Sequence, residues 1–170
     1  RKRGEQRAMP IFMAFLKKQS AVEYTKLWNL FVEHCPRLKS LRRVFVTTDF
    51  EAASHKAIRT VLPNAYIVGC WFHLKQAVVR YLRENSKTFY DDKESREELL
   101  ADIDALATDA SNNYEVERDK FNAKWNSRVP RFIGYFSKMY TDDTATFSPL
   151  LWARSKMPRV AHLDYTNNGA

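Results

Sequence analysis

The chain has 170 residues, of which 45% are hydrophobic and 14% aromatic, and its net charge is +8. This length and composition allow one domain with a sizeable core and argue against an intrinsically disordered chain. No apolar run reaches the roughly 18 residues that a membrane span needs, so we expect no membrane partner. The two cysteines, Cys35 and Cys70, are too few for a disulfide scaffold, so we expect a reduced intracellular setting.

The positive charge lies in the first half of the chain. Residues 1–90 hold 17 Lys and Arg against 6 Asp and Glu, whereas residues 91–170 hold 11 against 14. An excess of this kind attracts polyanions, above all nucleic acid, because binding releases counterions. A solvated basic surface without any partner is the alternative explanation.

The first half of the chain alternates strands with helices. Apolar and β-branched runs predict the strands, and apolar residues at i, i+3 and i+4 predict the helices. Ser20 with Glu23 is the signature of a capping box, and Pro36 and Pro63 end helices. In chain order we expect strand 9–16 (MPIFMAFL), helix 20–35, a basic connection 37–43, strand 44–48 (VFVTT), helix 50–62, strand 65–72 (AYIVGCWF) and helix 74–85. Such alternation is typical of a parallel sheet with helical crossovers.

The second half has only helical patterning up to residue 140. Its apolar stripes include Leu99, Phe121 and Phe136, and the pairs Asn112–Asn113 and Val129–Pro130 predict the breaks between helices. Loop and short pieces are expected over residues 141–170. The chain therefore divides into an α/β part (1–90), a helical part (91–140) and a loop-rich part (141–170).

Asp49 directly follows the predicted strand 44–48. Ligands of open α/β sheets gather beyond the carboxyl ends of the strands, and a carboxylate there can hold a divalent cation such as Mg²⁺. Asp is also a favoured N-cap residue, so the same side chain can cap the following helix instead. One carboxylate is not a complete active site, because two-metal chemistry needs several acids to fix cations about 4 Å apart.

Cys70 and His73 form a Cys-x-x-His pair, which resembles half of a zinc site. A catalytic Cys–His dyad is a second interpretation. A small buried cysteine, followed by a histidine where a helix begins, is a third. No second pair completes a zinc site from the remaining candidates, which are Cys35, His34, His55 and His162.

Several aromatic side chains allow either core packing or base stacking. Most of them lie at the spacing of core residues, which favours packing. The residues concerned are Trp28, Trp71, Phe72, Trp125 and Trp152.

Two segments in this order resemble the core of the Mutator-like element (MULE) transposases. TDFEAA (48–53) matches the family pattern "TDxExA", and GCWFHLKQAV (69–78) matches "GCxFHxxQA". Three further segments are similar to the family and follow in the family's order, so the resemblance covers nearly the whole chain. They are MPIFMAFLKKQSAVEYTKLWNLF (9–31), RFIGYFSKMY (131–140) followed by Trp152, and DYTNNGA (164–170).

The resemblance implies an α/β fold with a ribonuclease H-like mixed sheet and helical crossovers, incomplete at both ends and followed by an all-α insertion. It also implies metal-dependent DNA cleavage and strand transfer, carried out in the nucleus on transposon ends and target DNA by an intact protein that can form a homo-oligomer. In this family two aspartates and a glutamate hold two divalent cations, Mg²⁺ or Mn²⁺. Zinc would be the cofactor only if Cys70 and His73 belonged to a structural site.

Residue by residue, Asp49 corresponds to the second catalytic acid, and Cys70 and His73 correspond to the family's Cys-x-x-His signature. Asn167 and Asn168 match the pair that precedes the last acid. We expect the first acid upstream of Arg1 and the last acid just after Ala170. The chain is therefore expected to be a fragment that is inactive by itself.

Five basic residues are the candidates for holding the DNA backbone without reading its sequence: Arg42, Arg43, Lys75, Arg80 and Arg83. Three rival interpretations remain. One is a domesticated, non-catalytic DNA-binding protein derived from a transposase. The others are a decayed remnant without function and a structural zinc module.

Overall fold

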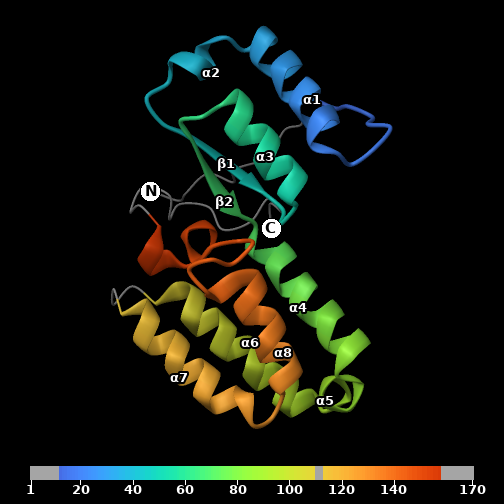
Figure 1. Ribbon diagram of the computed structural model, residues 1–170, viewed down its shortest axis with the longest axis vertical. Coiled ribbons are helices and arrows are strands. Elements are labelled where there is room, and N and C mark those ends of the chain that lie inside the picture. The colour runs from blue at the N-terminus through green and yellow to red at the C-terminus, as the bar shows by residue number, and fades with distance from the viewer. Residues whose placement is uncertain (1–11, 110–112, 158–170) are drawn as a thin grey trace, which may run out of the picture.

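The computed structural model describes residues 12–109 and 113–157 of the chain. Its fold is mixed α/β, with a parallel sheet of two strands and many helices (Figure 1). The mixed α/β class predicted from the sequence is therefore confirmed at this level. Asn167 and Asn168 lie outside the described residues.

The first described helix begins where the capping signal predicts. In α1 (Ala21–His34) the Ser20 hydroxyl oxygen accepts a hydrogen bond from the Glu23 backbone N–H at 3.3 Å. The Glu23 carboxylate turns to Lys26 at 2.8 Å, so no reciprocal half of the capping box is seen. Helix α1 ends just before Pro36, as expected from the missing N–H of proline.

Two details of this region differ from the sequence prediction. The basic connection contains a one-turn helix, α2 (Arg37–Ser40). Residues 12–16 are not a strand, and residues 9–11 of that prediction lie outside the described part. The physical reason is that a strand needs a neighbour for its backbone N–H and C=O groups, and no described strand pairs with residues 12–16. Met13 and Phe15 of this segment are largely exposed, Phe15 to 99%.

The sheet consists of β1 (Val44–Thr48) and β2 (Ala65–Gly69), joined by α3 (Ala52–Val61). The strands are parallel, and Val44 is paired with Ala65 at one end and Thr48 with Gly69 at the other. Because the strands are parallel, their carboxyl ends meet at the same edge. β1 has the predicted bounds, whereas β2 stops at Gly69 and not at residue 72.

The early end of β2 has a local cause. The Cys70 backbone N–H donates to the Thr48 carbonyl oxygen at 2.7 Å, which is the last bond from β2 to β1. The Cys70 carbonyl oxygen then accepts from Leu74 N–H at 3.1 Å, which starts helix α4 (Trp71–Asn85). Cys70 is therefore the junction between strand and helix, and His73 lies in the first turn of α4.

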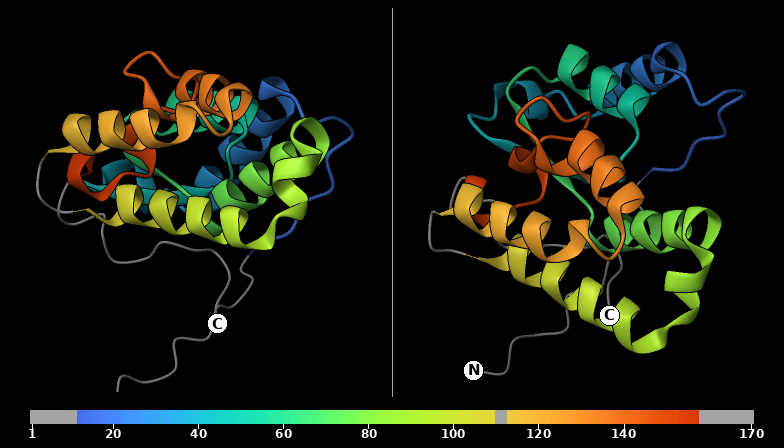
Figure 2. Two further views of the ribbon diagram at one scale, coloured as in Figure 1. Left: turned by 90° about the horizontal axis from the view of Figure 1, so that it is seen from below. Right: turned by 60° about the horizontal axis from the view of Figure 1, so that its bottom comes forward.

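Helix α4 leads from the sheet into the helical part (Figures 1 and 2). Asn113 and Val129 stand at the N-caps of two helices there, as the predicted breaks require. Asn112 lies outside the described residues. The remaining elements are α5 (Lys87–Asp91), α6 (Lys93–Thr108), α7 (Tyr114–Asn126), α8 (Pro130–Phe136), a π-helical turn (Ser137–Thr141) and 3₁₀ turns at Pro149–Leu151 and Arg154–Lys156.

One hydrophobic cluster connects the sheet with the helical part. It includes Ile67 and Val68 of β2 as well as Trp125 and Trp152, and both tryptophans are fully buried. Burying a large apolar side chain stabilises the fold by about 1.5–3 kcal/mol, so these aromatic residues act mainly as core residues. None of the described helices is long and apolar enough to cross a lipid bilayer.

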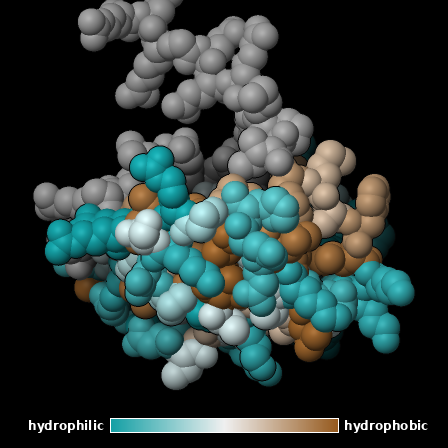
Figure 3. Space-filling view, turned by 90° about the horizontal axis from the view of Figure 1, so that it is seen from above, coloured by the Kyte–Doolittle hydropathy of each residue, from teal (hydrophilic) through white to brown (hydrophobic). Residues whose placement is uncertain are grey.

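A smaller cluster attaches α1 to α3 through Val32, Val61 and Leu62. The face of the molecule seen from above in Figure 3 shows hydrophobic side chains between hydrophilic ones. In α1, Val22 and Leu30 are among the exposed large hydrophobic residues, and Leu41 follows α2. Helix α1 therefore buries only part of its apolar surface against the described residues.

Candidate functional site

Asp49 stands at the carboxyl end of β1, where the sequence predicts it. Cys70 directly follows the neighbouring strand β2, and its backbone N–H donates a hydrogen bond to the carbonyl oxygen of Thr48. Asp49 and Cys70 therefore lie at the same edge of the sheet. This is the edge at which open α/β sheets bind ligands.

The carboxylate of Asp49 does not cap the next helix. Glu51 occupies the N-cap position of α3, and no side-chain capping bond is formed there. The Asp49 carboxylate accepts a hydrogen bond at 3.3 Å from the hydroxyl of Thr48. Between the residues that the structure describes, no ion pair involves Asp49, and its side chain is half-buried. It is a negative charge available to a cation.

His55 fixes the backbone at Asp49. Its Nε2 lies 2.8 Å from the Asp49 carbonyl oxygen, and because a carbonyl only accepts, Nε2 carries the proton and donates it. The His55 side chain is 3% exposed. Burial lowers its pKa and outweighs the hydrogen bond to Asp49, which raises it, while the charge of Arg59 lowers it further. The neutral imidazole is thus the form that this bond uses.

Phe50 is held between the sheet and the helical part. Its ring packs directly against Gly69, and it meets the rings of Tyr140 and Phe147 edge-on at centroid distances of 5.4 and 5.3 Å. Phe147 also contacts His55 at 5.5 Å. Tyr140 and Phe147 therefore support Phe50, which follows Asp49 in the chain, and Phe147 also supports His55, which donates to the Asp49 carbonyl oxygen.

Glu51 connects the site to α1. The Tyr24 hydroxyl donates to the Glu51 carboxylate at 2.7 Å. Desolvation by burial, together with this bond and the charges of Glu51 and Asp49, raises the pKa of Tyr24 to about 12. Tyr24 is consequently a stable hydrogen-bond donor at neutral pH.

Cys70 and His73 do not form a metal site by themselves. Cys70 is fully buried among core residues, and the buried Nδ1 of His73 has no hydrogen-bond partner in the structure. Residues 12–109 and 113–157 contain no group of three or more His, Cys, Asp or Glu side chains that could hold a metal. The donor set that zinc needs is therefore not assembled in the described part.

The structure separates the predicted DNA-binding residues into two groups. Lys75, Arg80 and Arg83 lie along one face of α4, which starts at the edge of the sheet that carries Asp49. Arg42 and Arg43 precede β1 and so lie at the opposite end of the strand. A strand of five residues spans roughly 17 Å, so the second group is remote from the site.

Sequence reasoning missed several supporting residues of the site. Gly69 had a local signal, since a glycine in a strand often marks a close approach of another group. His55, Tyr140 and Phe147 had none, because their relation to Asp49 and Phe50 arises from helix packing and from a loop that is distant in the chain.

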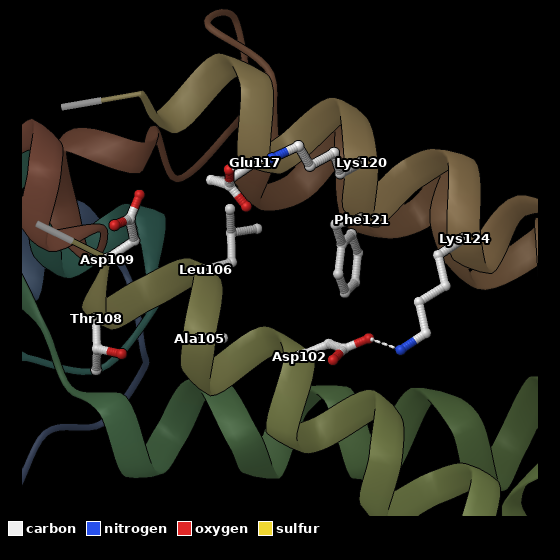
Figure 4. A pocket seen from close by; sticks show the side chains of 9 residues that line it. All are labelled: Asp102, Ala105, Leu106, Thr108, Asp109, Glu117, Lys120, Phe121 and Lys124. Carbon is white, nitrogen blue, oxygen red and sulfur yellow. Dashed lines mark hydrogen bonds and ion pairs between the residues drawn. The ribbon is translucent and has the colours of Figure 1, made fainter. Parts of the chain in front are cut away.

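A cavity of about 740 Å³ lies away from Asp49, between α6 and α7 (Figure 4). Its charges compensate each other: the Lys124 ammonium is 2.6 Å from Asp102 and the Lys120 ammonium is 2.7 Å from Glu117. Phe121 lies between these groups. With internal ion pairs and no contribution from the sheet, this cavity is not part of the Asp49 site.

No protein-family model, no curated protein and no solved structure matches this chain. The interpretation of the site therefore rests on its own residues and on their geometry. Two features define the site: the carboxylate at the end of β1, which has no ion-pair partner among the described residues, and the basic face of α4 that begins at the end of β2.

Proposed function

We propose that this chain belongs to a metal-dependent, DNA-cleaving and strand-transferring protein of the MULE transposase type, with a ribonuclease H-like core. The observation that carries the proposal is the position of Asp49. It is a half-buried carboxylate without a cationic partner among the described residues, placed at the shared carboxyl edge of β1 and β2. It stands inside the TDFEAA segment on which the family resemblance rests.

Asp49 fits the role of one ligand of a divalent cation, Mg²⁺ or Mn²⁺. Such a cation, when bound, supplies the activation of a water molecule or a DNA 3′ hydroxyl and the stabilisation of the leaving oxygen. The residues around Asp49 orient it: Thr48 donates to the carboxylate, and His55 donates to the backbone carbonyl oxygen. The resemblance assigns the other two acids to positions outside residues 1–170.

The arrangement of β1, α3 and β2 supports the proposed ribonuclease H-like core. Two parallel strands with an intervening helix bring Asp49 and the Cys70–His73 segment to one edge, as the proposal requires. The helical part supports this edge through the rings of Tyr140 and Phe147. In this proposal the helical part is the insertion, and it stabilises the catalytic edge.

The proposal is tested with a protein that carries this chain together with the two other acids the resemblance requires, on supercoiled plasmid DNA with Mg²⁺ or Mn²⁺. Asp49→Asn removes the charge and keeps the shape. We expect it to reduce cleavage to background and to leave DNA affinity within about twofold, because phosphate contacts come mainly from basic residues. Asp91→Asn is the matched control, since Asp91 is exposed and pairs only with Lys87 at 3.0 Å within the described part. Equal cleavage by Asp49→Asn and the parent would refute the metal role.

A second candidate is a non-catalytic DNA-binding protein derived from such a transposase. The basic face of α4 favours it, because this surface can hold phosphates without any metal. In that case DNA affinity would be the same with Mg²⁺ and with EDTA, and no cleavage would occur in either condition. Cleavage that depends on Mg²⁺ and Asp49 would exclude it.

A further inference from the structure

The outer face of α4 forms an open groove with a volume of about 630 Å³. The opposite face of the helix is buried in the core through Leu74, Ala77, Val78 and Leu82. The groove residues recur at intervals of three and four, so they form one face along the helix over roughly 18 Å. They are Trp71, Phe72, Lys75, Gln76, Val79, Arg80 and Arg83.

The charge of this groove is positive and largely uncompensated. No acidic residue lines it, and within residues 12–109 and 113–157 no ion pair involves Arg80 or Arg83. Lys75 pairs with Asp104 of α6 at 2.9 Å, but both side chains are well exposed, so solvent screens this pair. The α6–α7 cavity, in contrast, contains its own counter-charges. The groove is therefore complementary to a polyanion.

The groove also offers aromatic and apolar surface between the cations. Phe72 is 41% exposed, which is high for an apolar aromatic side chain. Trp71 is half-buried beside it, with the Lys75 ammonium 5.7 Å from the centre of its ring. Val79 continues the apolar strip along the helix. An aromatic ring flanked by cations is the arrangement that stacks unpaired bases and holds the backbone that joins them.

A duplex would use only half of these features. Its phosphates could meet Arg80 and Arg83, but its bases are stacked on each other and leave Phe72 without a partner. A single strand presents both phosphates and base faces. The combination of exposed ring and cations therefore favours a single strand.

We propose that the α4 groove binds single-stranded DNA, with Phe72 stacking on a base and Arg80 and Arg83 contacting phosphates. The inference rests on the proposed function only in taking DNA as the nucleic acid. The groove begins at Trp71, next to Cys70 and hence at the edge of the sheet that holds Asp49. A DNA strand bound along the groove would therefore have one end close to the Asp49 edge of the sheet. On binding, the Lys75 ammonium leaves the Asp104 carboxylate and contacts a phosphate of the DNA strand instead.

The experiment measures fluorescence anisotropy of labelled oligothymidine, and of the same strand in a duplex with oligoadenosine, on the full chain in EDTA. We expect the chain to prefer the single strand. Phe72→Ala should weaken single-strand binding by about 5- to 150-fold, the range expected for one lost base stack, and should leave duplex binding unchanged. Phe72→Leu keeps an apolar side chain without a ring, and it should lose affinity in the same way while preserving the fold.

Charge is tested with a matched pair of double variants. Arg80→Gln with Arg83→Gln should weaken binding of both DNA forms and reduce the dependence on salt. Lys56→Gln with Arg59→Gln removes the same charge from the exposed side of α3 and should have little effect. Unchanged single-strand affinity in Phe72→Leu, or equal losses in the two double variants, would overturn the proposal. Because no metal is present, the result is independent of whether Asp49 supports cleavage.

Discussion

The ring of Phe50 occupies the space into which a Cβ at Gly69 would project. A Cβ built on Gly69 would lie 2.7 Å from Cε1 of this ring, closer than real Cβ contacts allow. Phe50 is therefore packed against the bare backbone of the neighbouring strand. Since Phe50 directly follows Asp49, this contact fixes the chain at the proposed metal ligand.

Gly69→Ala should destabilise the protein by about 1–3 kcal/mol, the usual range for overpacking a filled site. The free energy of unfolding in urea measures the change. Gly134→Ala is the control, because a Cβ at this exposed position in α8 meets nothing within 4 Å. It should stabilise by about 0.5–1 kcal/mol, since alanine loses less backbone entropy than glycine in a helix. Equal effects at the two glycines would contradict the close contact.

His55 should make stability dependent on pH. Its pKa in the folded protein is lowered from 6.5, so the unfolded state binds the proton more tightly. Its contribution is fully present above about pH 6.5 and is lost as the pH falls through the lowered pKa of the folded state. The melting temperatures at about pH 7.5 and about pH 5 measure this loss, because these values lie above and below the unfolded-state pKa of about 6.5.

His55→Gln is the informative variant for this prediction. The amide of glutamine can still donate to the Asp49 carbonyl oxygen but does not titrate in this range. The variant should lose less stability than the parent on acidification. A parallel loss in the two proteins would show that the pH dependence arises elsewhere.

The Tyr24–Glu51 hydrogen bond should couple α1 to the turn after β1. A double-mutant cycle with Tyr24→Phe and Glu51→Ala, each of which removes one partner of the bond, measures this coupling through unfolding free energies. We expect about 0.5–1.5 kcal/mol, the usual net value of one hydrogen bond. Additive effects of the two substitutions would mean that the 2.7 Å contact does not stabilise the protein in solution.

Trp152 should transmit packing from the 3₁₀ turns to the site. Its indole N–H donates to the Tyr140 carbonyl oxygen at 3.1 Å, and the ring is fully buried. Trp152→Phe removes the donor and leaves a small void, and we expect a loss of about 1–3 kcal/mol. An unchanged melting temperature would exclude this supporting role.

The sequence alone determined the bounds of β1, the limits of α1 and the position of Asp49, whereas its prediction of a strand over residues 12–16 was wrong. Apolar β-branched residues placed β1 correctly, and the Ser20 cap and Pro36 bounded α1, because these signals act between residues close in the chain. The pairs Asn112–Asn113 and Val129–Pro130 likewise predicted the breaks before α7 and α8. The basic character of α4 was also visible, since residues at intervals of three and four share a helix face.

The tertiary structure alone decided what surrounds Asp49. The parallel register of β1 and β2 brings Cys70 beside it, and the packing of α3 and of residues 140–147 adds His55, Tyr140 and Phe147. The same packing sets Arg42 and Arg43 apart from Lys75, Arg80 and Arg83, which charge counting could not separate. The reason is physical: capping and periodicity are local, whereas contacts between strands and loops depend on how the whole chain closes around its core.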